Sequence, residues 1–96
     1  MPAYFVAELD VTNPAGFELY RAAVPATIAQ YGGRYVTRGG AAELIEGGPE
    51  LKRVVILEFA DVAAVKRWYD SPEIPKILQT RLANSTCRAF VVEGVS

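Results

Sequence analysis

The sequence predicts a single α+β domain over residues 1–96, in which the elements follow the order β-α-β-β-α-β. Three observations predict it. The 96 residues are 51% hydrophobic and 22% charged, which suits one globular folding unit. Apolar residues are concentrated in four strand-like segments, and they recur at helical spacing in two others. Helix-capping residues and glycine pairs separate these segments.

The first element is a strand over residues 3–11, AYFVAELDV, whose alternation places the even-numbered side chains on one face and the odd-numbered ones on the other. A helix follows, with Asn13 as its N-cap and the pair Gly32 and Gly33 at its end. Its apolar stripe consists of Phe17, Tyr20, Val24, Ile28 and Tyr31. Pro25 is expected to kink this helix, because proline removes a backbone hydrogen bond near Arg21.

Residues 34–46 and 52–60 predict a long β-hairpin around the segment GGPEL at 47–51. Gly39 and Gly40 fall inside its first arm, where glycines mark a bulge or bend that would re-aim Arg38. Asp61 can then cap a second helix, with Tyr69 on its apolar face and Trp68 at the edge of that face. The triplet Ser-Pro-Glu at 71–73 restarts this helix as N-cap, first-turn proline and acid. Residues 88–93, RAFVVE, supply the last strand.

This order is the ferredoxin-like arrangement, a four-stranded antiparallel sheet with both helices on one face. The third strand is apolar on both sides, with Val54 and Ile56 pointing one way and Val55 and Leu57 the other. Two helices cover only one face of a sheet. We therefore expect a homodimer in which a second copy packs sheet against sheet.

Composition excludes several classes of function. The net charge is −1 with no basic run, so nucleic acid is not an expected partner. No apolar run approaches the roughly 20 residues of a membrane span and no signal-peptide pattern begins the chain, so no membrane contact and a cytoplasmic location are expected. The absence of histidine excludes Ser-His and Cys-His catalysis, and no spacing predicts a metal site or a cofactor. Cys87 is the single cysteine and cannot form an internal disulfide.

Four segments in order, MPAYFVAELDVTNP, YGGRYVTRGG, RVVILEF and WYDSPE, resemble the bacterial family called domain of unknown function 1330, from residue 1 to about residue 94. The resemblance implies a dimeric α/β-barrel built from two ferredoxin-like subunits, and it implies no known activity. Similar dimeric barrels include cofactor-free monooxygenases, lactone isomerases and dechlorinating enzymes, and also proteins that only bind a ligand. The chain departs from the family pattern at Tyr31, where members often have histidine, and at Ile74, where they often have an aromatic residue.

Glu8 and Glu58 are candidate acid-base residues. Both are expected near the C-terminal ends of adjacent, parallel strands and on otherwise apolar faces, where a neighbouring like charge raises a carboxyl pKa. Arg38 is the expected counter-charge and could clamp a carboxylate or an enolate. In the alternative interpretation these residues form only structural ion pairs. Arg34, before a strand start, is expected to be solvated.

Glu8, Trp68, Tyr69 and Ser71 are candidate ligand-binding residues. Trp68 and Tyr69 are adjacent on a helix and point about 100° apart, so one belongs to the core and the other to a pocket mouth or the dimer seam. Ser71 begins a triplet that helix capping explains equally well.

The preferred interpretation is a homodimer that binds a small acidic or aromatic molecule in a cavity between sheet and helices. Its chemistry would be cofactor-free proton transfer or oxygenation, with Glu58 as base and Arg38 holding the developing anion. The alternative is a non-catalytic ligand-binding or dimeric interaction module, which the absence of histidine favours.

Overall fold

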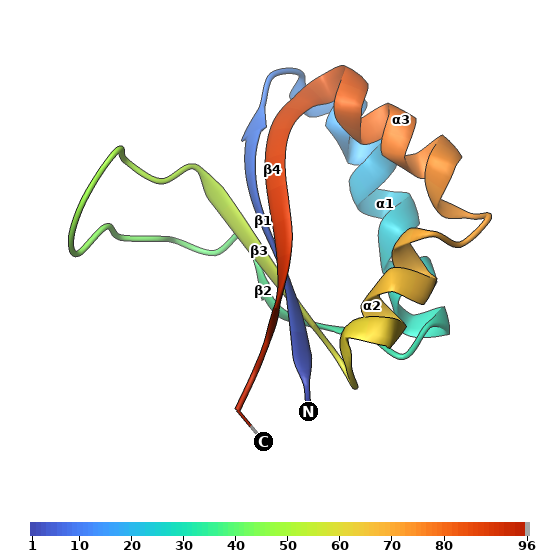
Figure 1. The fold of residues 1–96 in the computed structure, drawn as a ribbon. Coiled ribbons are helices and arrows are strands. Elements are labelled where there is room, and N and C mark those ends of the chain that lie inside the picture. The colour runs from blue at the N-terminus through green and yellow to red at the C-terminus, as the bar shows by residue number, and fades with distance from the viewer. Residues whose placement is uncertain (96) are drawn as a thin grey trace.

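A computed structural model describes residues 1–95, which form one four-stranded antiparallel sheet packed against three helices (Figure 1). In chain order the elements are β1 (Ala3–Val11), α1 (Pro14–Gln30), β2 (Arg34–Arg38), β3 (Arg53–Phe59), α2 (Val62–Tyr69), α3 (Ile74–Asn84) and β4 (Ser85–Glu93). The strands lie in the order β2-β3-β1-β4. The predicted ferredoxin-like order is confirmed, with its second helix divided into α2 and α3.

The predicted helix starts are confirmed for α1 and α2 but not for α3. The side chains of Asn13 and Asp61 accept hydrogen bonds from the N–H groups of Gly16 and Ala64, at 3.4 and 2.8 Å. The N-cap role predicted for Ser71 is wrong. Its backbone carbonyl accepts a hydrogen bond from the N–H of Ile74 at 3.2 Å, so residues 71–73 form a turn and α3 begins only after it.

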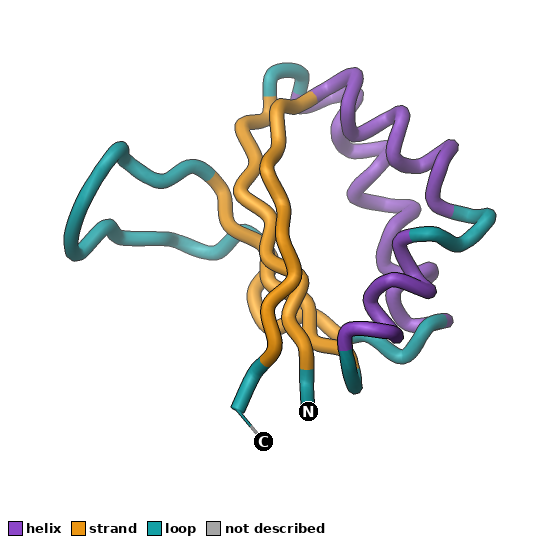
Figure 2. Tube along the Cα trace, in the orientation of Figure 1, coloured by secondary structure: helices purple, strands orange, loops and turns teal. Residues whose placement is uncertain are grey.

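The β2–β3 hairpin is much shorter than predicted. β2 ends at Arg38 because Gly39 adopts a φ of +75°, which leaves the extended conformation. Residues 39–52 form a loop that projects from the sheet, on the side away from the helices (Figures 1 and 2). Ile45 in this loop is 86% exposed, so the segment finds no apolar surface that would hold it as a strand.

β1 and β3 are antiparallel, so the predicted parallel pairing is wrong. Tyr4 lies opposite Glu58, and Glu8 lies opposite Val54. After α1, β2 runs parallel to β1 but is not adjacent to it. The strand β3 lies between the two and is antiparallel to both. Glu8 and Glu58 therefore lie at opposite ends of the sheet.

The core lies between the helices and the inner face of the sheet, which carries the odd-numbered side chains of β1. Trp68 is 2% exposed and packs against Phe5 and Phe59 with ring centroids 5.2 and 5.5 Å apart. Its predicted position at the edge of the apolar face is wrong, because α2 buries Ala64, Val65 and Trp68. Tyr69 is 36% exposed and lies at the edge instead.

All three helices cover one face of the sheet, as Figure 2 shows, and we call the other face the outer face. On the outer face, Val6 of β1 pairs with Ile56 of β3 and with Phe90 of β4. Phe90 and Val92 remain 53% and 46% exposed. No helix among the described residues is long and apolar enough to cross a bilayer.

Candidate functional site

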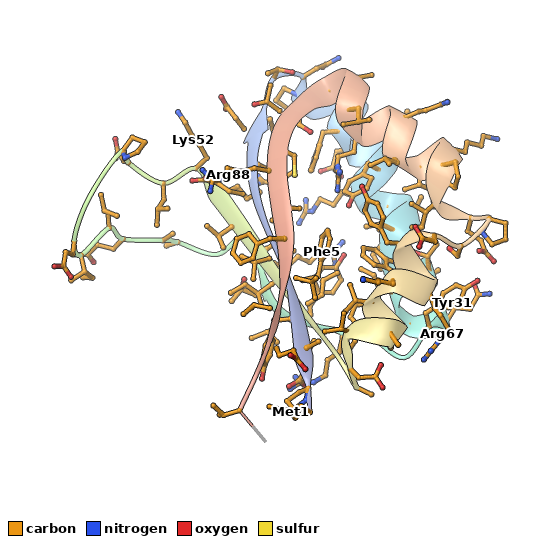
Figure 3. All side chains as sticks on the ribbon, in the orientation of Figure 1. Met1, Phe5, Tyr31, Lys52, Arg67 and Arg88 are labelled. Atoms are coloured by element: carbon orange, nitrogen blue, oxygen red, sulfur yellow. The ribbon has the colours of Figure 1, made fainter. Side chains whose placement is uncertain are left out.

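A cavity of about 40 Å³ lies between the inner face of the sheet and the helices, and side chains from β1, β2, β3 and all three helices line it. Figure 3 shows Phe5 pointing from β1 into this layer. Most of the lining is apolar, because the inward-facing residues of the strands and of α1 meet here.

Aromatic rings form a large part of the wall, and these are Phe5, Phe17, Tyr20, Tyr35 and Trp68. The Trp68 indole N–H donates a 3.0 Å hydrogen bond to the hydroxyl of Thr27, which in turn donates to the carbonyl of Val24 at 2.7 Å. This buried chain joins α2 to α1 and fixes the orientation of the indole ring at the cavity.

The charged lining residues are all arginines, namely Arg21, Arg38, Arg53 and Arg81. Within the described part of the chain, no carboxylate is among the lining residues. Three of the guanidinium groups lie against aromatic rings, with Cζ-to-centroid distances of 4.7 Å for Arg38 on Tyr35 and 5.8 Å both for Arg53 on Phe17 and for Arg81 on Tyr20. A ring attracts a cation without neutralising it. Arg38, Arg53 and Arg81 therefore carry positive charge available to a ligand, whereas Arg21 forms an ion pair with Glu18 at 3.0 Å.

Arg38 reaches the cavity because of a bulge in β2. Tyr35 pairs with Leu57, but the register shifts after it, so that Thr37 pairs with Ile56 and Arg38 with Val55. The extra residue turns Arg38 to the inner face, whereas Arg34 lies on the outer face. The predicted re-aiming of Arg38 is present, although the bulge between Tyr35 and Thr37 causes it, and not the two glycines.

The backbone of α1 also positions Arg38. Its guanidinium donates a 3.0 Å hydrogen bond to the carbonyl of Arg21. This is the carbonyl that would accept from residue 25, and Pro25 has no N–H to offer. Arg38 thus supplies the donor that the helix lacks.

Glu58 lies on the outer face and does not meet Arg38. Its carboxylate accepts hydrogen bonds from the Tyr4 hydroxyl at 3.0 Å and from Arg34 Nε at 2.6 Å. The expectation that Arg34 is only solvated is wrong, because it forms an ion pair with Glu58. The hydrogen bond to the Glu58 carboxylate raises the pKa of Tyr4 above its usual value.

The remaining predicted residues are dispersed. Glu8 lies on the outer face, opposite Arg88, and accepts a hydrogen bond from the backbone N–H of Lys52 at 3.3 Å. Tyr69 lines a separate shallow hollow of about 290 Å³ between α2 and β4. Ser71 is buried and does not line the cavity between the sheet and the helices. Of the six predicted residues, only Arg38 and Trp68 lie at the cavity between the sheet and the helices.

Sequence reasoning missed Arg81, although the spacing of α3 contained a signal for it. Arg81 follows Ile77 by four residues and Leu78 by three, so it occupies a position on the inward stripe of the helix. A charged residue at such a position is unusual, and Arg81 is only 6% exposed. The next residue, Leu82, is apolar but lies outside that stripe and is 58% exposed.

The two positions expected to depart from the family pattern also lie away from this cavity. Tyr31 follows α1 and donates a hydrogen bond to Glu73 at 3.1 Å, while Ile74 is a core residue with 4% exposure. Across residues 1–95, no three His, Cys, Asp or Glu side chains gather closely enough to hold a metal ion.

Comparison with known proteins shows the same fold in proteins of several bacteria. A protein of unknown function from Rhodopseudomonas palustris superposes with a TM-score of 0.79 at 19% identity, over 99% of this chain and 83% of the other. SnoaB, a cofactor-independent oxygenase from Streptomyces nogalater, has a TM-score of 0.68 at 17% identity, over 99% and 94%. A dabb family protein with a ferredoxin-like fold from Mesorhizobium loti has a TM-score of 0.62 at 12% identity, over 99% and 98%.

At the level of sequence, the model of the family described as domain of unknown function (DUF1330) matches residues 2–95. The chain matches no curated protein.

Proposed function

This chain belongs to the family described as domain of unknown function 1330, and from that premise we propose that it binds a small organic anion in the cavity between sheet and helices and transforms it without a cofactor. The observation that carries the proposal is an aromatic cavity whose charged lining residues are all arginines, with no carboxylate among them in the described chain. Guanidinium groups around an apolar site stabilise an enolate or phenolate and lower the pKa of the acid that forms it.

The reaction class in this proposal is proton transfer or oxygenation. A bound acid that ionises releases its proton to water, and the resulting carbanion can donate electrons to dioxygen as co-substrate. Support comes from the fold, which this chain shares with a cofactor-independent oxygenase. In this proposal Arg38 holds the anion at the mouth, while Glu58 takes no part because it lies on the outer face.

The size of the cavity restricts the ligand. Its volume of about 40 Å³ is well below the roughly 150 Å³ that holds a benzene ring in a closed protein cavity. A charged head group fits as the cavity stands. An aromatic body requires the exposed side chains of Arg38 and Arg53 to move outward, and for Arg38 this movement breaks the hydrogen bond to the Arg21 carbonyl.

A second candidate function is ligand binding without catalysis. The observation that favours it is the lack of any carboxylate among the described lining residues, in a chain that has no histidine. The cavity then has no ordinary general base, and the arginines would serve only for recognition.

We also propose that the protein works as a cytoplasmic homodimer, with the outer faces of two copies packed together. Exposed Phe90 and Val92 and the apolar row through Val6 support this pairing. The outer face also carries charges of both signs, in the pair Arg34 and Glu58 and in Arg88 opposite Glu8. A two-fold axis can place the positive charges of one copy against the negative charges of the other.

The test uses Trp68, which is the only tryptophan and lies in the cavity wall. Chelator-treated protein is titrated with small enolisable and phenolic aromatic compounds, while Trp68 fluorescence and oxygen consumption are recorded. We expect quenching, and for a substrate oxygen uptake, in the wild type and in the control Arg34→Gln, with at least tenfold weaker binding in Arg38→Gln. Quenching without oxygen uptake or product supports the binding module, and no quenching by any compound overturns the proposal.

A further inference from the structure

We propose that Arg81 is the anion-binding residue at the buried end of the cavity and that the ligand presents a carboxylate to it. This inference rests on the proposed function and adds the chemical class of the ligand. Arg81 is 6% exposed, and its Nε atom is buried without a hydrogen-bond partner. Among residues 1–95, no ion pair involves its guanidinium.

The groups around Arg81 do not supply a counter-charge. Tyr20 lies with its ring centroid 5.8 Å from Arg81 Cζ, and burial raises the pKa of the Tyr20 hydroxyl. Burial likewise raises the pKa of the nearby Cys87 thiol. Both groups are therefore neutral near pH 7.

Arg81 itself stays charged. Burial acts to lower its pKa, but the guanidinium still keeps its proton near pH 7. A buried charge without a partner is strongly unfavourable, and arginine cannot escape the cost by losing its proton. An anionic ligand would remove this penalty.

The geometry favours a carboxylate over a larger anion. Nε and a terminal nitrogen of a guanidinium lie side by side and match the two oxygens of a planar carboxylate. One buried arginine balances one negative charge, and a cavity of about 40 Å³ admits a group of that size. The aromatic walls then receive the apolar remainder of the ligand, toward the exposed Arg38 and Arg53.

The experiment compares the wild type with Arg81→Met and with Arg67→Met, a matched control that removes an exposed helical arginine. Thermal unfolding and Trp68 fluorescence are measured with benzoate and acetate as carboxylates, with benzyl alcohol and acetamide as neutral counterparts, and with sodium chloride at equal ionic strength. We expect benzoate to stabilise the wild type and Arg67→Met but not Arg81→Met. Without any ligand, Arg81→Met should unfold at the same or a higher temperature than the wild type, because it no longer buries an unpaired charge.

Equal stabilisation of Arg81→Met and wild type by benzoate would overturn the inference. If benzyl alcohol quenches Trp68 as strongly as benzoate in all three proteins, the cavity still binds ligands but Arg81 does not select a carboxylate. If no compound changes the fluorescence, the proposed function fails together with the inference. Should Arg81→Met not fold, Arg81→Lys keeps the charge and loses the two-point geometry, and at least tenfold weaker benzoate binding is then expected.

Discussion

Tyr4 and Arg34 both donate hydrogen bonds to the carboxylate of Glu58 on the outer face of the sheet. In Glu58→Gln the acceptor is neutral, so the pKa of Tyr4 should fall toward 10.0, because the hydrogen bond to the carboxylate is the main reason that it is raised. The measurement is a pH titration of phenolate absorbance, with Tyr4→Phe to identify the signal. Ligand quenching of Trp68 should not change in Glu58→Gln. A loss of ligand binding there would place Glu58 in the binding site, contrary to its position on the outer face.

Tyr31 and Glu73 join the end of α1 to the turn before α3 and predict a pH dependence of stability. The pKa of Glu73 is lowered from 4.5, first by its own backbone N–H and also by the hydrogen bond from Tyr31. A lowered pKa in the folded state contributes stability above the unfolded pKa, and this contribution is lost as pH falls through the folded value. Urea unfolding of Tyr31→Phe should therefore show a smaller loss of stability below about pH 4.5 than the wild type. Parallel pH profiles for the two proteins would contradict this role.

At the scale of elements, α1 and β2 are coupled through the carbonyl of Arg21. Pro25→Ala restores the N–H that this carbonyl lacks, so the helix gains a hydrogen bond and Arg38 must share its backbone acceptor. One added backbone hydrogen bond should raise the free energy of unfolding by about 1 kcal/mol. Ligand binding, measured by Trp68 quenching, should weaken several-fold, because the shared carbonyl holds Arg38 less firmly at the mouth. Chemical denaturation and fluorescence titration measure the two effects, and a more stable variant with unchanged binding would show that Arg38 needs no such support.

Helix ends and strand ends differ in how well local sequence predicts them. Asn13 and Asp61 cap their helices as expected, because an N-cap contacts only the next few residues. The predicted start of α3 and the predicted end of β2 differ from the structure. Ser71 and Gly39 lie in turns, and the geometry of a turn depends on the elements that it connects. The bulge in β2 carries no composition signal of its own, because it results from pairing with β3.

At the scale of the molecule, the outer face predicts assembly. Phe90→Glu places a charge at the centre of the proposed dimer interface, and we expect at least a hundredfold weaker dimer, roughly 3 kcal/mol. The matched control is Leu82→Glu, because Leu82 is similarly exposed but lies on α3, in the helix layer. Sedimentation velocity over a concentration series measures both variants. A monomeric wild type, or a dimer that tolerates Phe90→Glu, would exclude the outer face as the interface.

The sequence by itself determined the element order, two of the three helix starts, the alternation of β1 and the two-sided apolar strands. These properties depend on interactions between residues close in sequence, so local propensity and periodicity can predict them. Of the candidate site it identified Arg38 and Trp68. Only the tertiary structure decided that β3 runs against β1, that Glu58 pairs with Arg34 on the outer face, and that Arg81 joins Arg38 around one aromatic cavity. These contacts join residues far apart in the chain. They depend on strand direction, strand register and the packing of α3 on α1, which local sequence patterns do not predict.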